Sequence, residues 1–229
     1  MKYFFLICAR SGSKGLKNKN LKKIKNTTLV GWSIRTAKKL KNYARIVVNS
    51  NSSRILSIAR KEGASFLIKR PEILARSNSK EIDVWKHSIN ILKEKEEFSK
   101  IKFLISLPPT SPCRSAKDVK MCIKKFETRK YDIVICITPS KKNPYFNIVE
   151  IKRKNFLKVC ISKKKFYNRQ EAPITYDITT VCYVADINYI KKAKNILEGR
   201  VGYVIVPEER SIDIDTKYDF KIAKKILER

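Results

Sequence analysis

Apolar runs of strand length alternate with amphipathic stretches along most of the chain. Strands are predicted at 3–8, 44–49, 65–68, 102–107, 132–137, 179–185 and 201–206. Between them, residues 79–96 place Ile82, Trp85, Ile89 and Leu92 on one helical face, and residues 115–128 do the same with Val119, Cys122, Ile123 and Phe126. This alternation predicts an α/β fold with a mostly parallel sheet and helices on both faces.

Residues 139–178 interrupt the alternation. The segment is rich in proline and lysine and contains only two short strand-like pieces, around 146–151 and 156–161. We therefore expect one domain over residues 1–229 with an inserted segment at 139–178. The first apolar run is too short for a signal peptide, and no window reaches the ~18 uncharged apolar residues of a membrane span. We expect a cytoplasmic protein without a membrane partner.

The charge balance is the most unusual feature of the composition. The chain has 52 Lys and Arg against 21 Asp and Glu, a formal net charge of +31. Such an excess is typical either of a protein with a polyanionic partner or of a solvated lysine-rich surface. The lysines are dispersed in short runs without a known nucleic-acid motif, which favours the solvated surface and no specific nucleic-acid partner.

Cysteine and histidine usage argues against two common kinds of site. The 6 cysteines form no Cys-x-x-Cys pair and mostly lie within apolar runs, as expected for buried thiols in a reducing compartment. His87, the single histidine, lies off the apolar face of its predicted helix, so we expect it in solvent. The sequence therefore offers few of the residues that a Cys/His zinc site or a Ser-His-Asp triad needs.

The first predicted strand runs directly into a glycine-containing basic loop, ARSGSKGLKNKN over residues 9–20. Open α/β sheets bind ligands at the carboxyl ends of their strands. Backbone N–H groups at the glycines can turn toward an anion, while Arg10, Lys14 and Lys19 bring positive charge. The spacing matches neither the dinucleotide nor the Walker motif, so a phosphate-binding loop and an ordinary basic turn both stay open.

Two further segments carry candidate chemistry. In PEERSIDIDT at 207–216, an extended backbone places Asp213 and Asp215 on one side, and paired carboxylates suit Mg²⁺. Alternatively, the pair only leads into a last helix capped by Thr216 and Asp219. In LPPTSPCR at 107–114, the hydroxyls and Arg114 could face a polar ligand at the same sheet edge, or the segment is only a turn.

These segments together resemble the acylneuraminate cytidylyltransferase family, the CMP-sialic acid synthetases and their relatives. The matching motifs occur in the family's order: ARSGSKGLKNKNL, VVNSN, KRPEILA, PPTSPCR, NRQEAP and PEERSIDIDTKYDF. The resemblance implies a Rossmann-like nucleotidyltransferase that pairs as a homodimer through the segment at 139–178. It also implies transfer of CMP from CTP to the anomeric hydroxyl of an acidic 2-keto-3-deoxy sugar, with Mg²⁺ and release of pyrophosphate, for envelope glycans such as lipopolysaccharide.

The resemblance also assigns roles to individual residues. The expected catalytic residues are Arg10, Lys19, Asp213 and Asp215, and the two aspartates would hold Mg²⁺. The expected nucleotide-binding residues are Arg10, Ser11, Gly12, Ser13, Lys14, Asn20 and Arg70. The expected sugar-side residues are Thr110, Ser111, Arg169, Gln170 and Asp177, with Arg169 and Gln170 placed to reach a partner subunit's site.

Several positions depart from the family pattern. Pro108 replaces a glutamine, and the stretch from Asp177 replaces Arg-x-Asn-Gly-Ala. A carboxylate there repels an acidic substrate, so we expect a nonulosonic acid other than N-acetylneuraminate, or an octulosonic acid. On the nucleotide side, residues 49–51 and 77–81 replace Ser-Thr-Asp and Asp-Thr-Ala-Ser-Ser, which leaves an inactive polyanion-binding homologue as an alternative.

Overall fold

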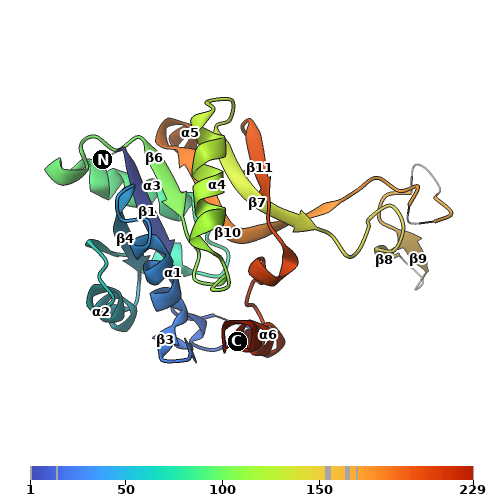
Figure 1. Cartoon of the computed structure of the whole chain (residues 1–229), viewed down its shortest axis with the longest axis horizontal. Helices are drawn as coiled ribbons and strands as arrows, with labels where there is room; N and C mark the ends of the chain where they lie inside the picture. Colours follow the sequence, from blue (N-terminus) through green and yellow to red (C-terminus); the bar gives the residue numbers. More distant parts are fainter. Residues whose placement is uncertain (1, 14, 153–155, 163–165, 169, 229) are drawn as a thin grey trace.

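The protein is built around a sheet of 7 strands in the order β11-β7-β10-β6-β1-β4-β5 (Figure 1). The computed structural model describes residues 2–13, 15–152, 156–162, 166–168 and 170–228. The strands are β1 (Tyr3–Cys8), β4 (Ala44–Ser50), β5 (Phe66–Lys69), β6 (Phe103–Ser106), β7 (Ile133–Pro139), β10 (Tyr176–Asp186) and β11 (Val201–Ile205). Each strand predicted from an apolar run is therefore present.

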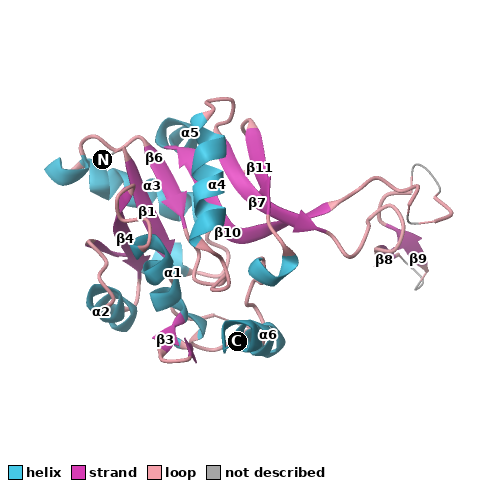
Figure 2. Cartoon of the chain, in the orientation of Figure 1, coloured by secondary structure: helices cyan, strands magenta, loops and turns pink. Residues whose placement is uncertain are grey.

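Helices cover both faces of this sheet (Figure 2). One face packs against α1 (Leu29–Lys38), α2 (Ser53–Lys61) and α4 (Ala116–Glu127), and the other against α3 (Glu81–Lys93) and α5 (Ile187–Lys192). A smaller core joins α6 (Lys217–Glu228) to the short strand β2 (Lys23–Ile24), which pairs with β3 (Thr27–Thr28). The layered α/β arrangement confirms the predicted Rossmann-like fold.

One strand runs against the others. β1 is parallel to β4 and β6, β4 to β5 and β7 to β11, whereas β10 is antiparallel to both β6 and β7. The register of β10 against β7 shifts between Thr179 and Tyr183. Because β10 is reversed, its first half lies at the carboxyl ends of the neighbouring strands, and irregular strands often occur beside active sites. This places Thr180 near those ends.

The segment between β7 and β10 extends away from the body of the molecule as an arm (Figure 1). Its only regular structure among the described residues is the antiparallel pair β8 (Val149–Ile151) and β9 (Leu157–Val159). Large apolar side chains of the arm are exposed, including Ile151 at 74%, Phe156 at 69% and Ile174 at 80%. The division into one domain with a dimerisation insert stays a prediction.

The cysteines lie mostly inside the protein, as expected. Cys113, Cys122, Cys136 and Cys182 are buried thiols, whereas Cys160 in the arm is exposed. The expectation for His87 is wrong, because its ring is partly buried and its Nδ1 lies 3.4 Å from the Asn49 amide nitrogen. Across the described ranges, no helix has the length and apolar character needed to cross a bilayer.

Candidate active site

A cleft of about 790 Å³ opens at the carboxyl ends of β1, β5 and β6. Ligand sites of open α/β sheets lie at this edge. The structure brings together these predicted residues along its wall: Arg10, Ser13, Lys19, Asn20, Arg70, Thr110, Asp213 and Asp215. Ser11, Gly12, Ser111, Gln170 and Asp177 are not among the lining residues. Lys14 and Arg169 lie outside the described residues.

The basic loop after β1 forms one wall of the cleft. Asn20 donates from its Nδ2 to the Arg10 carbonyl oxygen at 2.9 Å, and the Ser11 N–H donates to Asn51 Oδ1 at 2.9 Å. Gly12 has a φ of +74°, in the left-handed region that favours glycine. Ser11 and Gly12 therefore shape the loop, while the Arg10 side chain lines the cleft.

The basic loop and the acidic segment meet although nearly the whole chain separates them. Lys19 Nζ lies 2.9 Å from Asp215 Oδ1. A β-carbon on Gly15 would lie 2.4 Å from the Asp215 carbonyl oxygen. Only glycine permits this approach of the two backbones, so Gly15 fixes the distance between the cationic wall and the acidic segment.

The acidic segment presents two carboxylates to the cleft. Ile214 is fully buried and its N–H donates to the Thr110 carbonyl oxygen at 2.9 Å, so its neighbours Asp213 and Asp215 face the other way. The predicted cap also forms, with the Thr216 N–H donating to Asp219 Oδ2 at 2.7 Å. The segment thus leads into α6 and lines the cleft, and the two interpretations are compatible.

Arg70 lies at the floor of the cleft and is itself buried. Its Nε donates to Asn49 Oδ1 at 2.7 Å and its Nη2 to the Asn49 carbonyl oxygen at 3.0 Å. Asn49 Nδ2 in turn donates to the Ser88 hydroxyl at 2.8 Å. The asparagine that departs from the family pattern therefore orients the arginine and ties it to α3.

The residues expected on the sugar side do not all lie at the cleft. Thr110 lines the cleft, and its hydroxyl lies 3.1 Å from that of Thr180, which also contacts the Ser111 hydroxyl at 2.7 Å. Thr180 was not selected as a site residue, although it lies in the stretch from Asp177 that departs from the family pattern. Gln170 and Asp177 are exposed on the arm and at the start of β10.

The expectation that Arg114 faces a ligand is wrong. The side chain is buried, and its Nη1 donates to Ser33 Oγ at 2.7 Å. Its Nη2 donates to the carbonyl oxygens of Pro108 and Thr180, so the guanidinium supports the Pro-Pro-Thr loop from below. Arginine is suited to this role because its fork of donors satisfies several carbonyls at once.

Glu81, the first residue of α3, is a further cleft residue that sequence reasoning did not select. Burial raises the pKa of its carboxyl group to about 7, and the negative charge of Asp213 adds to this effect. Arg70 acts in the opposite direction by favouring the charged form. The cleft therefore holds a carboxyl group that changes charge near neutral pH.

This shift predicts a pH-dependent loss of stability. The pKa of Glu81 is about 7 in the folded protein against an ordinary value of 4.5, so the folded state holds the extra proton between these values. Stability then falls as pH rises through this window, by at most roughly 3 kcal/mol. The measurement is the free energy of unfolding from denaturant titrations at pH 5 and at pH 8. Between these pH values it should fall less in Glu81→Gln than in the unsubstituted protein. An equal loss in both proteins would contradict the assignment.

Comparison with known proteins places the chain in a family. A sequence model described as cytidylyltransferase matches residues 4–226. The post-translational flagellin modification protein B of Campylobacter coli is 33% identical over 224 residues, 96% of this chain and 93% of its own length. The CMP-N,N'-diacetyllegionaminic acid synthase of Campylobacter jejuni is 34% identical over 223 residues, again 96% of this chain and 93% of its own length.

Two further proteins are similar to this chain, one in sequence and one in fold. The N-acylneuraminate cytidylyltransferase of Escherichia coli is 30% identical over 232 residues, all of this chain but 52% of that protein. The structure of a CMP:2-keto-3-deoxy-manno-octonic acid synthetase complexed with CTP superposes with a TM-score of 0.72 at 14% identity, covering 100% of this chain and 99% of that one. The chain belongs to the cytidylyltransferase family.

Proposed function

We propose that the protein transfers CMP from CTP to the anomeric hydroxyl of an acidic 2-keto-3-deoxy sugar and releases pyrophosphate. The observation that carries this proposal is the cleft, which is lined by the basic side chains of Arg10 and Lys19 and by the carboxylates of Asp213 and Asp215. At about 790 Å³ it lies within the usual size range of ligand sites. The named relatives that align along nearly all of the chain support the choice of CTP and a sugar acid.

Mg²⁺ fits the acidic side of this cleft. Asp213 Oδ1 is buried and has no hydrogen-bond partner within the described ranges. This oxygen is therefore available to coordinate a cation. Among the described residues, no group of three or more His, Cys, Asp or Glu side chains gathers into a protein-only metal cage. Mg²⁺ commonly takes one or two carboxylates and completes its shell with water and phosphate oxygens. We propose Asp213 and Asp215 as its protein ligands.

The remaining chemistry consists of positioning and charge neutralisation. The sugar hydroxyl attacks the α-phosphorus in line, and pyrophosphate leaves toward the cationic loop. Arg10 and Lys19 stabilise the negative charge that develops on the leaving group. Asp213 and Asp215 would hold Mg²⁺, which would supply further positive charge against the same developing charge. No covalent intermediate with a side chain is needed.

We propose that the acceptor is a nonulosonic acid other than N-acetylneuraminate, with CTP drawn from the cytoplasm. The support is the similarity to a relative named for N,N'-diacetyllegionaminic acid. Asp177, the departure from the family pattern, does not line the cleft of its own chain and would meet the acceptor only where two copies pair. The test is pyrophosphate release from CTP with a panel of sugar acids. Fastest release with a diacetamido nonulosonic acid supports the proposal, and faster release with an octulosonic acid would move the acceptor to that class. No release with any acid would contradict the activity.

We also propose that two copies pair through the arm. The exposed apolar side chains of the arm, including Ile151, Phe156 and Leu157, are of the kind that a protein interface covers. Pairing would also bring the exposed Gln170 and Asp177 close to a second copy. Sedimentation equilibrium tests this, because a mass of 26.6 kDa at micromolar concentration would rule the pairing out.

A further inference from the structure

The segment that carries the two proposed metal ligands has little regular structure of its own. It runs from β11 to α6 and contains only a short 3-10 turn, Glu208–Arg210, before Asp213 and Asp215. Ile214 and the Asp219 cap hold its second half in place. In its first half Val206 is fully buried and Ile212 packs on the smaller core, but no side chain of the turn between them is buried. The turn therefore requires an anchor other than packing, because unpacked residues sample many backbone conformations. Glu208 also pairs with Lys141, but both side chains are largely exposed, so this contact contributes little.

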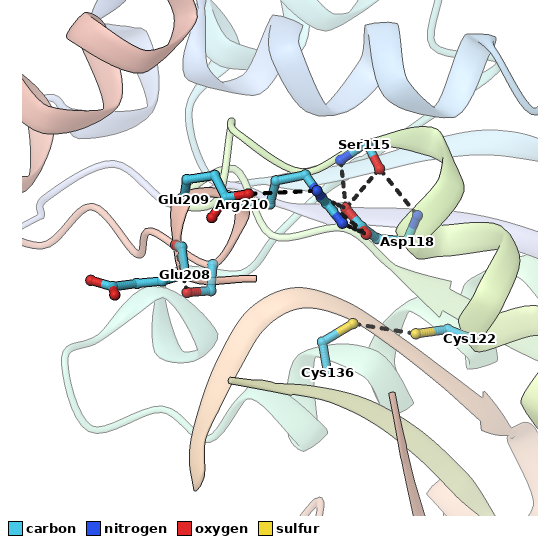
Figure 3. A network of polar contacts seen from close by, with 8 residues as sticks. Ser115, Asp118, Cys122, Cys136, Glu208, Glu209 and Arg210 are labelled. Carbon is cyan, nitrogen blue, oxygen red and sulfur yellow. Dashed lines mark hydrogen bonds and ion pairs between the residues drawn. The ribbon is translucent and has the colours of Figure 1, made fainter. Parts of the chain in front are cut away.

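That anchor is an ion pair with a buried carboxylate on α4. Arg210 Nε lies 3.0 Å from Asp118 Oδ2, and Arg210 Nη2 lies 3.1 Å from Asp118 Oδ1 (Figure 3). The Asp118 side chain is fully buried, whereas that of Arg210 is 32% exposed. The two residues are 92 positions apart in sequence, so the pair is a tertiary contact between the loop and α4.

Asp118 has a local role that does not require Arg210. It forms a capping box with Ser115, whose N–H and hydroxyl both donate to Asp118 Oδ2 at 2.8 Å (Figure 3). The Asp118 N–H donates in return to Ser115 Oγ at 3.2 Å, which completes the capping box without Arg210. Burying a charged carboxylate nevertheless costs free energy, because the charge loses its hydration. The Arg210 guanidinium offsets this cost by donating two charge-assisted hydrogen bonds to Asp118.

We infer that Asp118 and Arg210 form a positioning pair that holds the carboxylates of Asp213 and Asp215 in place for a divalent cation. The inference rests on the proposed function. Arg210 is not among the residues that line the cleft, so it acts through the loop. Groups that orient metal ligands typically change metal affinity by about 10- to 100-fold when they are altered.

Arg210→Lys tests the pair, because lysine keeps the charge but loses the planar fork. A matched control is Arg200→Lys. Arg200 makes a similar fork to Asp132, with Nη2 at 2.9 Å from Oδ1 and Nε at 3.2 Å from Oδ2. That pair lies at the starts of β7 and β11, the end of the sheet opposite the cleft. Asp118→Asn provides a second variant on the other side of the Arg210 contact.

Two readouts decide the matter. The first is amide hydrogen exchange of residues 208–216 without nucleotide or metal, which should be faster in Arg210→Lys than in Arg200→Lys. The second is the Mg²⁺ concentration that half-maximally tightens CTP binding in calorimetry, which should rise about tenfold in Arg210→Lys and stay unchanged in the control. Asp118→Asn should act in the same direction.

Wild-type exchange and wild-type Mg²⁺ response in Arg210→Lys would overturn the positioning role and leave the proposed function intact. Conversely, if the unsubstituted protein binds CTP with Mg²⁺ but transfers CMP to no sugar acid, the proposed function fails, and the two readouts still decide the role of the pair. If CTP binding does not respond to Mg²⁺ in the unsubstituted protein, both are overturned.

Discussion

Asp215→Asn is expected to reduce Mg²⁺-dependent CMP transfer at least about a hundredfold, because it removes one of two charged oxygen ligands from the cleft. The fold should be unaffected. The Asp215 side chain is 73% exposed, whereas that of its partner Lys19 is 12% exposed. Asparagine keeps an oxygen that can accept from Lys19 Nζ, so we expect little loss of stability. The measurement is steady-state pyrophosphate release over a range of Mg²⁺ concentrations, together with the thermal midpoint.

The matched control for this variant is Asp132→Asn. Asp132 is also paired to a basic side chain, Arg200, but at the opposite end of the sheet. We expect normal turnover in the control. Persistent Mg²⁺-dependent transfer in Asp215→Asn, with the control unchanged, would place the metal elsewhere.

Arg10→Ala is expected to weaken CTP binding by about 10- to 100-fold, the effect of losing one hydrogen bond to a charged phosphate. Arg10 follows β1 at the wall of the cleft, and the one hydrogen bond described for its side chain is a long contact of 3.3 Å from Nη1 to the Ala75 carbonyl oxygen. Its removal should therefore change ligand affinity far more than stability. Calorimetric titration with CTP measures the effect directly.

Arg60→Ala is the control for lost charge, because Arg60 is an exposed residue near the end of α2 that does not line the cleft. Equal weakening in both variants would mean that CTP responds to the overall charge of +31 rather than to the loop. Unchanged affinity in Arg10→Ala would contradict the phosphate-binding assignment of the loop.

Much of the fold could be predicted from the sequence because its signals are local. Buried strands such as β1 and β6 are continuous apolar runs, and helices such as α4 show an apolar face together with the Ser115 and Asp118 box. The direction of β10 could not be predicted in this way. An apolar run has the same composition whether its strand is parallel or antiparallel to its neighbours.

The site was predicted only where a motif marks it. The glycine loop and the paired aspartates are contiguous in sequence, and the structure brings both to one cleft. Thr180, Glu81 and the contact between Asp118 and Arg210 depend on tertiary packing. Arg114 and His87 were misplaced for the same reason, since charge and helical periodicity do not reveal which partners a side chain finds in the core.

Calorimetric titration of the full chain with CTP, ATP, GTP and UTP, each with and without Mg²⁺ at moderate salt, is the decisive test of the proposed cytidylyltransferase activity. We expect CTP to bind at least about tenfold more tightly than the other three nucleotides, and Mg²⁺ to strengthen its binding. Equal binding of all four nucleotides, weakening steeply as salt is added, would instead identify a general polyanion-binding protein and contradict the assignment.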